Sequence, residues 1–456
     1  MTGATNVDVE VVVVGAGAGG LAAALAVADQ GKSVVVLEKL ERAGGNSALS
    51  TGSIPAAASR LQVEAGVEDS PEQMTADLLA QSGPHEAEDL TRVLSEESGP
   101  LVDWLVDTHH VELLLIKDYK HVGHSVHRLH APPSRRGADL VRDMVTACNL
   151  AGIDILLSNP VKELITEGDA VVGVVVAGDR LKPYEIRCNS VILASNGFAA
   201  NKDLVNEWLP AVSGVEYFGA HGSTGEALQW GLEQGGYLRN IGAYQGYAAV
   251  AYPHGSILSW TTIEMGAVLV TEHGGRLGDE SIGYSGFAQA VADSGLPCFV
   301  VFDTRIRDHA AKEDEFAELI EAGGVRELNS IAELADFIGA DEADLSRTLE
   351  SYSSAARGES EDAFGRQSFG MAPLAFPLCA SRVTPGVFHT QGGLAVDDHG
   401  QVLRSNGDFV SGLFAVGGVA AGISGQSGGR GYSSGNGLLA AAGLGRLAGI
   451  AASQTA

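Results

Sequence analysis

Residues 11–20, which read VVVVGAGAGG, constrain the fold of this chain more than any other segment. Four β-branched residues predict a buried strand, and Gly15, Gly17 and Gly20 predict a tight turn into the apolar helix that follows. A second apolar strand, VVVLE, ends at Glu38. This arrangement places a pyrophosphate at a helix N-terminus, where free N–H groups favour negative charge, and a carboxylate beside the ribose hydroxyls. The sequence therefore predicts a dinucleotide site.

The loop after Glu38 indicates which dinucleotide binds. It reads ERAGGNSALSTGSIP, with glycines that allow close backbone approach and short polar side chains. This Gly-Gly-Asn-Ser-x-x-Ser-Thr-Gly loop resembles the flavoprotein family of fumarate reductases, succinate dehydrogenases and 3-ketosteroid Δ1-dehydrogenases. In that family the loop runs along the FAD pyrophosphate and ribityl chain, so the resemblance implies FAD. The loop lacks the histidine through which succinate dehydrogenases attach flavin, so we expect non-covalent FAD.

Four later motifs resemble the same family in the same order. They are VILASNGF (191–198), HGSTGEAL (221–228), GLFAVGGVAAG (412–422) and SGNGLLAAAGLGRLAG (434–449). In the family, the N-terminus of the last helix points at the flavin N1–C2=O edge, where it stabilises the anionic reduced flavin. The residues that the resemblance assigns to the FAD site are Gly15, Ala16, Gly17, Ala18, Gly19, Gly20, Glu38, Lys39, Gly45, Asn46, Ser47, Ser50, Thr51, Gly52, Val161, Asn196, Gly197, Glu226 (where Asp is usual), Gly418, Asn436, Leu438 and Leu439.

The resemblance also implies an α/β fold, in which a Rossmann-like FAD-binding domain carries an inserted α+β cap domain for substrate. We expect residues 1–244 and 375–456 to form the FAD domain and residues 245–374 the cap. Within the first part, residues 71–115 have amphipathic helical spacing, and residues 151–194 alternate as short strands. No second strand–GxGxxG–helix unit is present, so we expect no NAD(P)H domain. Electrons would then pass through oxygen, a quinone or an electron-transfer protein.

Composition excludes several classes of function. The net charge of −28 argues against nucleic acid and anionic membrane as partners. The four cysteines are far apart and form no CxxC pair, so we expect no disulfide, metal site or c-type haem. The apolar run that begins at Val11 is interrupted by the glycine pattern of a nucleotide fold, and no basic region precedes it. We therefore expect a cytoplasmic enzyme without membrane insertion.

One segment of the expected cap carries a candidate for proton transfer. In the family's fumarate reductases this segment reads Asn-Glu-x-x-x-Arg and the Arg donates a proton, whereas ketosteroid dehydrogenases have Asn-Glu-x-x-x-Tyr with a Tyr base. Here GRLGDESIGYSGF has Asp279-Glu280 and Tyr284 at those positions. Arg276 lies upstream and does not replace the missing arginine. The resemblance implies that Tyr284 is the base; the alternative is an aromatic residue packed at the cap.

A second tyrosine fits the same chemistry. Ketosteroid dehydrogenases have a Tyr-x-Gly-x-Gly segment before the last helix, whose phenol and glycine N–H hold the substrate carbonyl oxygen. GGRGYSSGNG places Tyr432 there, and Gly435 or Gly437 could supply the N–H, because the spacing differs slightly. Such donors form an oxyanion hole. A ketone suits this machinery, since its α-proton is far more acidic than that of a carboxylate and tyrosine has a reference pKa near 10.

Two further residues suggest that the substrate also bears a carboxylate. His389 in HTQGGL resembles the family's His-Thr-x-Gly-Gly segment, in which the histidine binds a substrate carboxylate; the alternative is a flavin contact. Arg430 resembles the family's second carboxylate-binding arginine, in a lengthened segment; the alternative is an ordinary ion pair.

Two weaker candidates for substrate binding lie in His-containing segments. Residues 117–136, KDYKHVGHSVHRLHAPPSRR, hold Tyr119 and four histidines and form either an exposed polar loop or the lining of a polar pocket. The histidines are His121, His124, His127 and His130. His254 in YPHGS lies where the family's cap begins, so it is the second candidate.

Together these features predict an FAD-dependent α,β-desaturase of a cyclic ketone, similar to 3-ketosteroid Δ1-dehydrogenase-like and 4-oxocyclohexanecarboxylate desaturase-like enzymes. A small keto acid such as an oxocyclohexanecarboxylate fits Arg430 and His389 better than a steroid does. The alternatives are a 3-ketosteroid Δ1-dehydrogenase, a fumarate or urocanate reductase, and a non-catalytic FAD redox partner.

Overall fold

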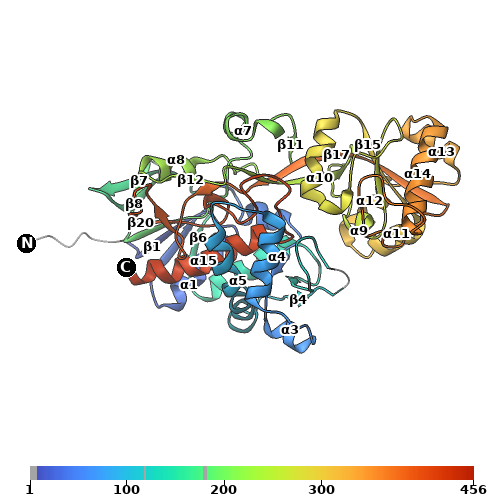
Figure 1. Cartoon of the computed structure of the whole chain (residues 1–456). Helices are drawn as coiled ribbons and strands as arrows, with labels where there is room; N and C mark the ends of the chain where they lie inside the picture. The colour runs from blue at the N-terminus through green and yellow to red at the C-terminus, as the bar shows by residue number, and fades with distance from the viewer. Residues whose placement is uncertain (1–7, 118–119, 178–181, 456) are drawn as a thin grey trace, which may run out of the picture. The chain divides into compact units, whose positions relative to one another are not determined.

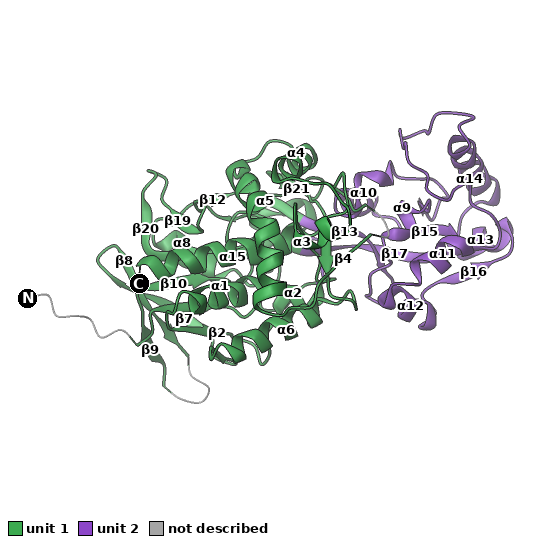
Figure 2. Cartoon of the chain, turned by 90° about the horizontal axis from the view of Figure 1, so that it is seen from below, with its two compact units in different colours: residues 1–213, 219–244, 389–456 green, residues 214–218, 245–388 purple. Residues whose placement is uncertain are grey.

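The computed structural model describes residues 8–117, 120–177 and 182–455. These residues form two compact units (Figure 2). The first unit holds the described residues up to Ser213, Gly219–Tyr244 and those from His389 onward, and the second holds Gly214–Phe218 and Gln245–Phe388. The second unit extends past the expected cap end at 374, because strand β17 (Leu378–Thr390) pairs with other strands of that unit.

The first unit is built on a nine-stranded sheet with the path β6-β2-β1-β10-β20-β8-β7. Its strands are β1 (Val11–Val14), β2 (Val34–Leu37), β6 (Asp154–Leu156), β7 (Val161–Glu167), β8 (Ala170–Val176), β9 (Tyr184–Arg187), β10 (Ser190–Leu193), β19 (Gln401–Leu403) and β20 (Phe409–Ala415). The strands from β6 to β20 pair in parallel, and β7, β8 and β9 form an antiparallel meander. Strand β1 is buried along its whole length, as its run of valines predicts.

In the first unit, helix α1 (Ala18–Asp29) packs against helix α15 (Asn436–Thr455), the last helix of the chain (Figure 1). Small residues allow this close approach, since a Cβ on Gly445 would lie 2.3 Å from the Gly19 carbonyl oxygen. The two helices run in the same direction, because Gly19 near the start of α1 faces Gly445 and Ala23 faces Gly449. The structure confirms the predicted Rossmann-like α/β fold.

The remaining elements of the first unit surround this core. Its helices are α2 (Gly45–Leu49), α3 (Arg60–Glu64), α4 (Pro71–Ser82), α5 (Glu88–Asp103), η1 (Trp104–Thr108), α6 (Gly137–Leu150), α7 (Lys202–Trp208), η2 (Pro210–Val212), α8 (Glu226–Glu233) and η4 (Gly417–Val419). Its short strands are β3 (Ile54–Pro55), β4 (Leu114–Leu115), β5 (Leu129–Ala131), β12 (Leu238–Arg239), β18 (Gly393–Leu394) and β21 (Ser427–Gly428). Among the described residues, no helix combines the length and the hydropathy that crossing a membrane requires.

The second unit is a smaller sheet covered by helices. Its strands are β11 (Glu216–Tyr217), β13 (Gly242–Ala251), β14 (Val268–Thr271), β15 (Cys298–Asp303), β16 (Arg326–Leu328) and β17. Its helices are α9 (Thr261–Glu264), η3 (Glu280–Ile282), α10 (Tyr284–Ser294), α11 (Thr304–Ala310), α12 (Asp314–Glu321), α13 (Ile331–Ile338) and α14 (Glu342–Ala356). The core of this unit includes Val268, Val301 and Tyr352.

Candidate active site

The turn between β1 and α1 leaves room for a phosphate. A Cβ on Gly20 would lie 1.9 Å from the Gly15 carbonyl oxygen, so this glycine is needed for strand–helix packing. A Cβ on Gly17 would instead meet no atom closer than 3.5 Å, and Gly17 begins α1 without a side-chain cap. The first turn of α1 is therefore open on the side of Gly17, where the N–H groups of a helix N-terminus attract an anion.

Glu38 lies at the end of β2 and is 8% exposed. Its Oε2 accepts the Ala16 N–H at 2.9 Å, and its Oε1 accepts the Leu40 N–H at 2.8 Å. Each carboxylate oxygen keeps a further lone pair that can accept a ribose hydroxyl. Beside it, the Lys39 ammonium forms an ion pair with Glu226 at 2.9 Å.

The polar loop after Glu38 folds against the first turn of α1. The Ser47 hydroxyl accepts the Ala18 N–H at 3.1 Å, and the Ser50 hydroxyl donates to the Ser47 carbonyl at 2.8 Å. The Asn46 side-chain oxygen accepts the Ala220 N–H at 2.6 Å. The other predicted loop residues, Gly45, Thr51 and Gly52, lie in the same segment, with a 3.0 Å bond between the Thr51 and Ser53 hydroxyls.

The start of α15 carries polar atoms that no described residue satisfies. The Asn436 Oδ1 and the Ser433 Oγ are both buried and have no hydrogen-bond partner within the described residues. Buried polar atoms are normally paired, so these two suit a bound ligand. With the open turn at Gly17, the acceptor at Glu38 and the helix N-terminus at Asn436, the donor set fits FAD.

The remaining predicted FAD residues lie on the same unit. Asn196 follows β10 and donates from its amide to the Ser223 hydroxyl at 2.7 Å. A Cβ on Gly418 would lie 2.4 Å from the Asn196 Oδ1. A Cβ on Gly197 would lie 1.8 Å from the Thr390 Oγ1. Val161 begins β7, and Leu438 and Leu439 lie buried in the first turn of α15.

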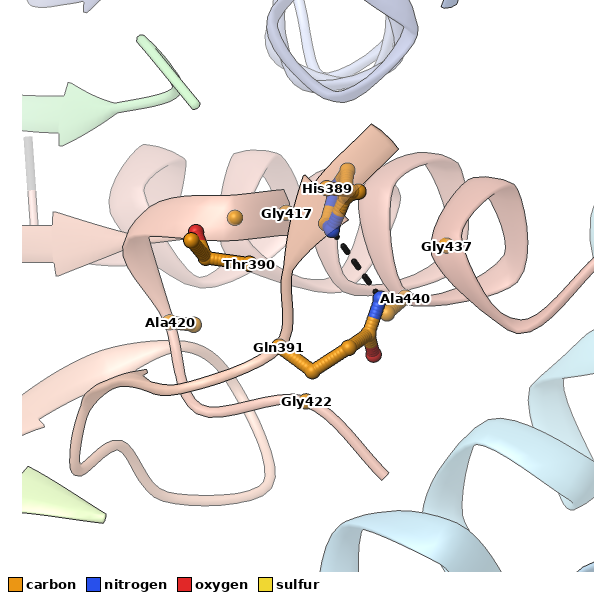
Figure 3. Close-up of a pocket in the computed structure, with 9 residues that line it drawn as sticks. His389, Thr390, Gln391, Gly417, Ala420, Gly422, Gly437 and Ala440 are labelled. Atoms are coloured by element: carbon orange, nitrogen blue, oxygen red, sulfur yellow. Dashed lines mark hydrogen bonds between the residues drawn. The ribbon is translucent and has the colours of Figure 1, made fainter. Parts of the chain in front are cut away.

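A small pocket lies beside the first turn of α15 (Figure 3). The residues that line it are His389, Thr390, Gln391, Gly417, Gly418, Ala420, Gly422, Gly437 and Ala440. The Gln391 Nε2 lies 3.0 Å from the His389 Nδ1, as the dashed line in Figure 3 marks. Sequence reasoning missed Gln391, although its place in HTQGGL, next to a candidate histidine, was a usable signal.

Tyr432 contacts Gly437, one of the residues that line this pocket. The Gly437 N–H donates to the Tyr432 hydroxyl at 3.3 Å, and a Cβ on Gly437 would lie 4.0 Å from the His389 Nε2. Gly435, the other candidate, packs against Pro55, since a Cβ there would lie 2.6 Å from the Pro55 Cδ. Burial raises the pKa of the Tyr432 hydroxyl to about 12, so it stays a donor at neutral pH.

The two candidates for carboxylate binding differ in environment. Burial lowers the pKa of His389 to about 4, so its ring is neutral near pH 7 and offers an N–H rather than a positive charge. Arg430 is exposed, and its guanidinium has no ion-pair partner among the described residues. Its carbonyl accepts the Gln81 amide at 2.8 Å.

In the second unit, Tyr284 is the first residue of α10 and belongs to an aromatic cluster. Its ring centroid lies 5.2 Å from that of Tyr247 and 6.1 Å from that of Trp260. Tyr247 also stacks on Phe388 at 5.3 Å with an angle of 6° between the rings. The Tyr247 hydroxyl donates to the Leu258 carbonyl at 3.0 Å, which orients the ring next to Tyr284.

A buried ionic network holds the turn before Tyr284. Arg276 forms ion pairs with Glu280 at 2.6 Å and Asp362 at 2.5 Å, and its side chain is 4% exposed. Arg366 donates to the Glu280 carboxylate at 3.2 Å and to the carbonyls of Ala267 and Ile263. Both arginines are therefore fully engaged in structure.

The weaker candidates are dispersed. His254 lies exposed in the turn after β13, in the second unit. Tyr119 lies outside the described residues. Of the histidines in residues 117–136, His124 and His130 are buried, and the His130 Nε2 lies 2.8 Å from the Ser59 hydroxyl.

The chain is similar to known proteins. The chain is 31% identical over 412 residues to the NADH:fumarate oxidoreductase of Klebsiella pneumoniae (strain 342), a match that covers 89% of this chain and 44% of that protein. It is 28% identical over 328 residues to the 4-oxocyclohex-2-ene-1-carboxylate 5-dehydrogenase of Sinomonas cyclohexanicum, covering 63% of this chain and 55% of that one. This chain thus spans about half the length of these relatives.

The fold is similar to a solved structure, the open conformation of a flavocytochrome c3 fumarate reductase. The TM-score is 0.82 with 28% identity, over 98% of this chain and 78% of the other. The family model described as "FAD binding domain" matches residues 10–438, which confirms the FAD prediction. The chain therefore belongs to the FAD binding domain family of flavoproteins.

Proposed function

We propose that this protein is an FAD-dependent desaturase that removes hydrogen from the carbons α and β to the carbonyl of a cyclic ketone. The observation that carries the proposal is the contact between the Tyr432 hydroxyl and the Gly437 N–H, which donates to it at 3.3 Å. A carbonyl oxygen bound beside this contact can accept from the phenol and share the N–H. Two donors that can share one acceptor suit an oxygen on which negative charge develops. A protonated Tyr432 at neutral pH agrees with that role.

Each step of the reaction has a candidate residue. Tyr432 and Gly437 bind the carbonyl oxygen and stabilise the enolate that forms there. Tyr284 takes the α-proton, as a general base does when it lies within hydrogen-bond reach of that proton. FAD, when bound, supplies the acceptor for the hydride that leaves the β-carbon. The electrons then pass to an acceptor such as oxygen, a quinone or an electron-transfer protein.

Reduction of fumarate is the alternative that sequence identity favours, since the relative from Klebsiella pneumoniae carries that name. Two residues of the second unit argue against fumarate reduction. Tyr284 stands where fumarate reductases have their proton-donating arginine. The nearest arginine in sequence, Arg276, is bound in the ionic network with Glu280 and Asp362.

We further propose that the substrate is a small keto acid, such as 4-oxocyclohexanecarboxylate or its enone. Arg430 supports this proposal, because its exposed guanidinium is available for a bidentate carboxylate contact. The name of the Sinomonas cyclohexanicum relative supports the same substrate class. His389, being neutral, would add a hydrogen bond and not a charge.

Anaerobic mixing tests the proposal. Holoenzyme and 4-oxocyclohexanecarboxylate are combined without any reductant, and the flavin absorbance and the mass of the product are followed. Bleaching together with loss of two hydrogens from the ketone is the expected result. Bleaching by a 3-ketosteroid alone would favour the steroid alternative. If no cyclic ketone bleaches the flavin and fumarate or urocanate reoxidises the reduced enzyme, the proposal is overturned. If none of these compounds changes the flavin absorbance, a non-catalytic redox partner is favoured.

A further inference from the structure

Residues 122–124 belong to a loop of the first unit that holds residues 432–437, the segment with the two proposed oxyanion donors. The Ser434 N–H donates to the Val122 carbonyl at 3.0 Å, and the His124 Nε2 donates to the Ser434 carbonyl at 2.9 Å. A carbonyl oxygen only accepts, so His124 carries its proton on Nε2. Both backbone groups of Ser434 are thus held by residues 122–124.

The contact between the loop and this segment is also closely packed. Gly123 has a φ of +83°, and a Cβ there would lie 2.2 Å from the Ser433 Oγ and 2.5 Å from the Ser433 Cβ. The conformation and the space both require glycine. His124, Ser433 and Ser434 are buried, so water does not compete for their hydrogen bonds.

An ionic group centred on the buried Arg128 anchors the loop on its other side. Asp77 accepts the Ser125 N–H at 3.0 Å and the Ser125 hydroxyl at 2.6 Å. Arg128, which is 1% exposed, donates to Asp77 at 2.5 Å and to both carboxylate oxygens of Asp69 at 2.7 Å. Such a bidentate, charge-assisted contact is geometrically specific, so the loop has little freedom to shift.

Ser434 lies between Tyr432 and Gly437 in the chain, and donor pairs of this kind act only when their geometry is maintained. We propose that His124 is a positioning residue, which fixes the Tyr432–Gly437 donor pair through its bond to the Ser434 carbonyl, with Asp77 and the buried Arg128 as the anchor of its loop. The inference rests on the proposed function, because it takes that pair as the site of the substrate oxygen. It assigns a role to the His-rich segment other than a pocket lining or an exposed loop.

The ionisation state of His124 agrees with this role. Burial lowers the pKa of His124 to about 4, and the nearby Arg128 acts in the same direction, whereas the Ser434 carbonyl, Asp77 and Asp69 oppose it. The ring is therefore neutral near pH 7, with one N–H to give. That single donor is engaged by Ser434.

Two variants separate positioning from general stability. His124→Gln keeps an N–H donor, whereas His124→Leu has a similar volume and none. Both are purified with FAD bound, and amide hydrogen exchange of the peptide that spans residues 432–438 is measured beside thermal unfolding. His130→Leu is the matched control, because His130 is an equally buried histidine that contacts Ser59 and not Ser434.

We expect faster exchange of residues 432–438 in His124→Leu, near-normal exchange in His124→Gln, and no change there in His130→Leu. With 4-oxocyclohexanecarboxylate as reductant, His124→Leu should slow flavin bleaching by about 10²-fold, the usual cost of misplaced groups, while His124→Gln recovers most of the rate. Equal exchange in all three variants, or equal losses in Leu and Gln that follow thermal stability, would overturn the inference. If no ketone bleaches the flavin of the wild-type enzyme, the proposed function is wrong. The hydrogen-exchange test can still be interpreted in that case, because it does not require turnover.

Discussion

The amide nitrogen of Gly437 lies 3.3 Å from the hydroxyl oxygen of Tyr432, at the first turn of α15. A side chain at position 437 would enter the space between Tyr432, Gln391 and His389. Backbone and side-chain donors therefore meet at one point, beside the positive end of a 20-residue helix. Such a point favours an oxygen that gains negative charge.

Tyr432→Phe should fold normally and bind FAD, yet reduce the rate of flavin bleaching by roughly 10²–10³, the usual worth of an oxyanion donor. The ring stays, and only the donor is lost. Stopped-flow absorbance with a cyclic ketone measures the change. Tyr352→Phe is the control, since that hydroxyl serves the second unit's structure by donating to the Gly266 carbonyl. A Tyr432→Phe enzyme as fast as wild type would remove the oxyanion role.

Tyr284→Phe should lose turnover by about 10²–10⁴, the range for a general base. The aromatic contacts with Tyr247 and Trp260 are kept in this variant, so its stability should change little. Tyr247→Phe is the matched control in the same cluster and should stay close to the wild-type rate. If Tyr247→Phe and Tyr284→Phe slow turnover equally, the cluster matters only as packing.

The sequence predicted the fold well because its strongest signals are local. The valine run, the glycine turn and Glu38 each determine their own backbone, and the structure has β1, α1 and β2 at those places. The residue at which the second unit ends was harder to predict. Strand β17 is continuous and pairs with strands that are distant in the sequence, and no local pattern reveals such pairing.

The candidate site was predictable only in part. Motif resemblance singled out Tyr432 but left Gly435 and Gly437 as alternatives for the N–H, because the spacing of this segment differs from that of the family; the bond from the Gly437 N–H to Tyr432 appears only in the folded chain. The bond from His124 to Ser434 joins residues 310 positions apart, and the bond of Gln391 to His389 depends on side-chain direction. Such contacts follow from the tertiary fold and have no periodicity in sequence.

Glu38→Ala should weaken FAD binding by roughly 1.5–3 kcal/mol, as for the loss of a hydrogen bond to a charged group. The variant also frees the Ala16 and Leu40 N–H groups that Glu38 now accepts. Titration of apoprotein with FAD, followed by flavin fluorescence, gives the affinity. Glu10→Ala is the control, because Glu10 binds Lys32 and Ser33 in the same βαβ unit.

Acid precipitation of the holoenzyme should release the flavin into solution, because we expect it to be bound non-covalently. Flavin colour retained in the protein pellet would contradict non-covalent binding.

Acid should destabilise the protein through its buried histidines. Burial lowers the pKa of His124, His130 and His389 to about 4, below the unfolded value near 6.5. The unfolded chain therefore binds more protons between these values, and the free energy of unfolding falls as pH drops from about 6.5 toward 4. Urea unfolding at several pH values measures this slope. His130→Gln should reduce the slope, and an unchanged slope would show that His130 does not contribute.

The charge of the substrate is tested by changing both partners of one contact. Arg430→Ala, or esterification of 4-oxocyclohexanecarboxylate, should each raise KM strongly, because an arginine–carboxylate contact is charge-assisted and often bidentate. Arg430→Ala should hardly affect KM for the ester, since the shared interaction is already absent. Arg239→Ala is the control, as that arginine stacks on Tyr237 elsewhere in the first unit. If wild type and Arg430→Ala handle the acid equally well, the substrate does not use Arg430, and the ketone desaturase proposal stands on Tyr284 and Tyr432 alone.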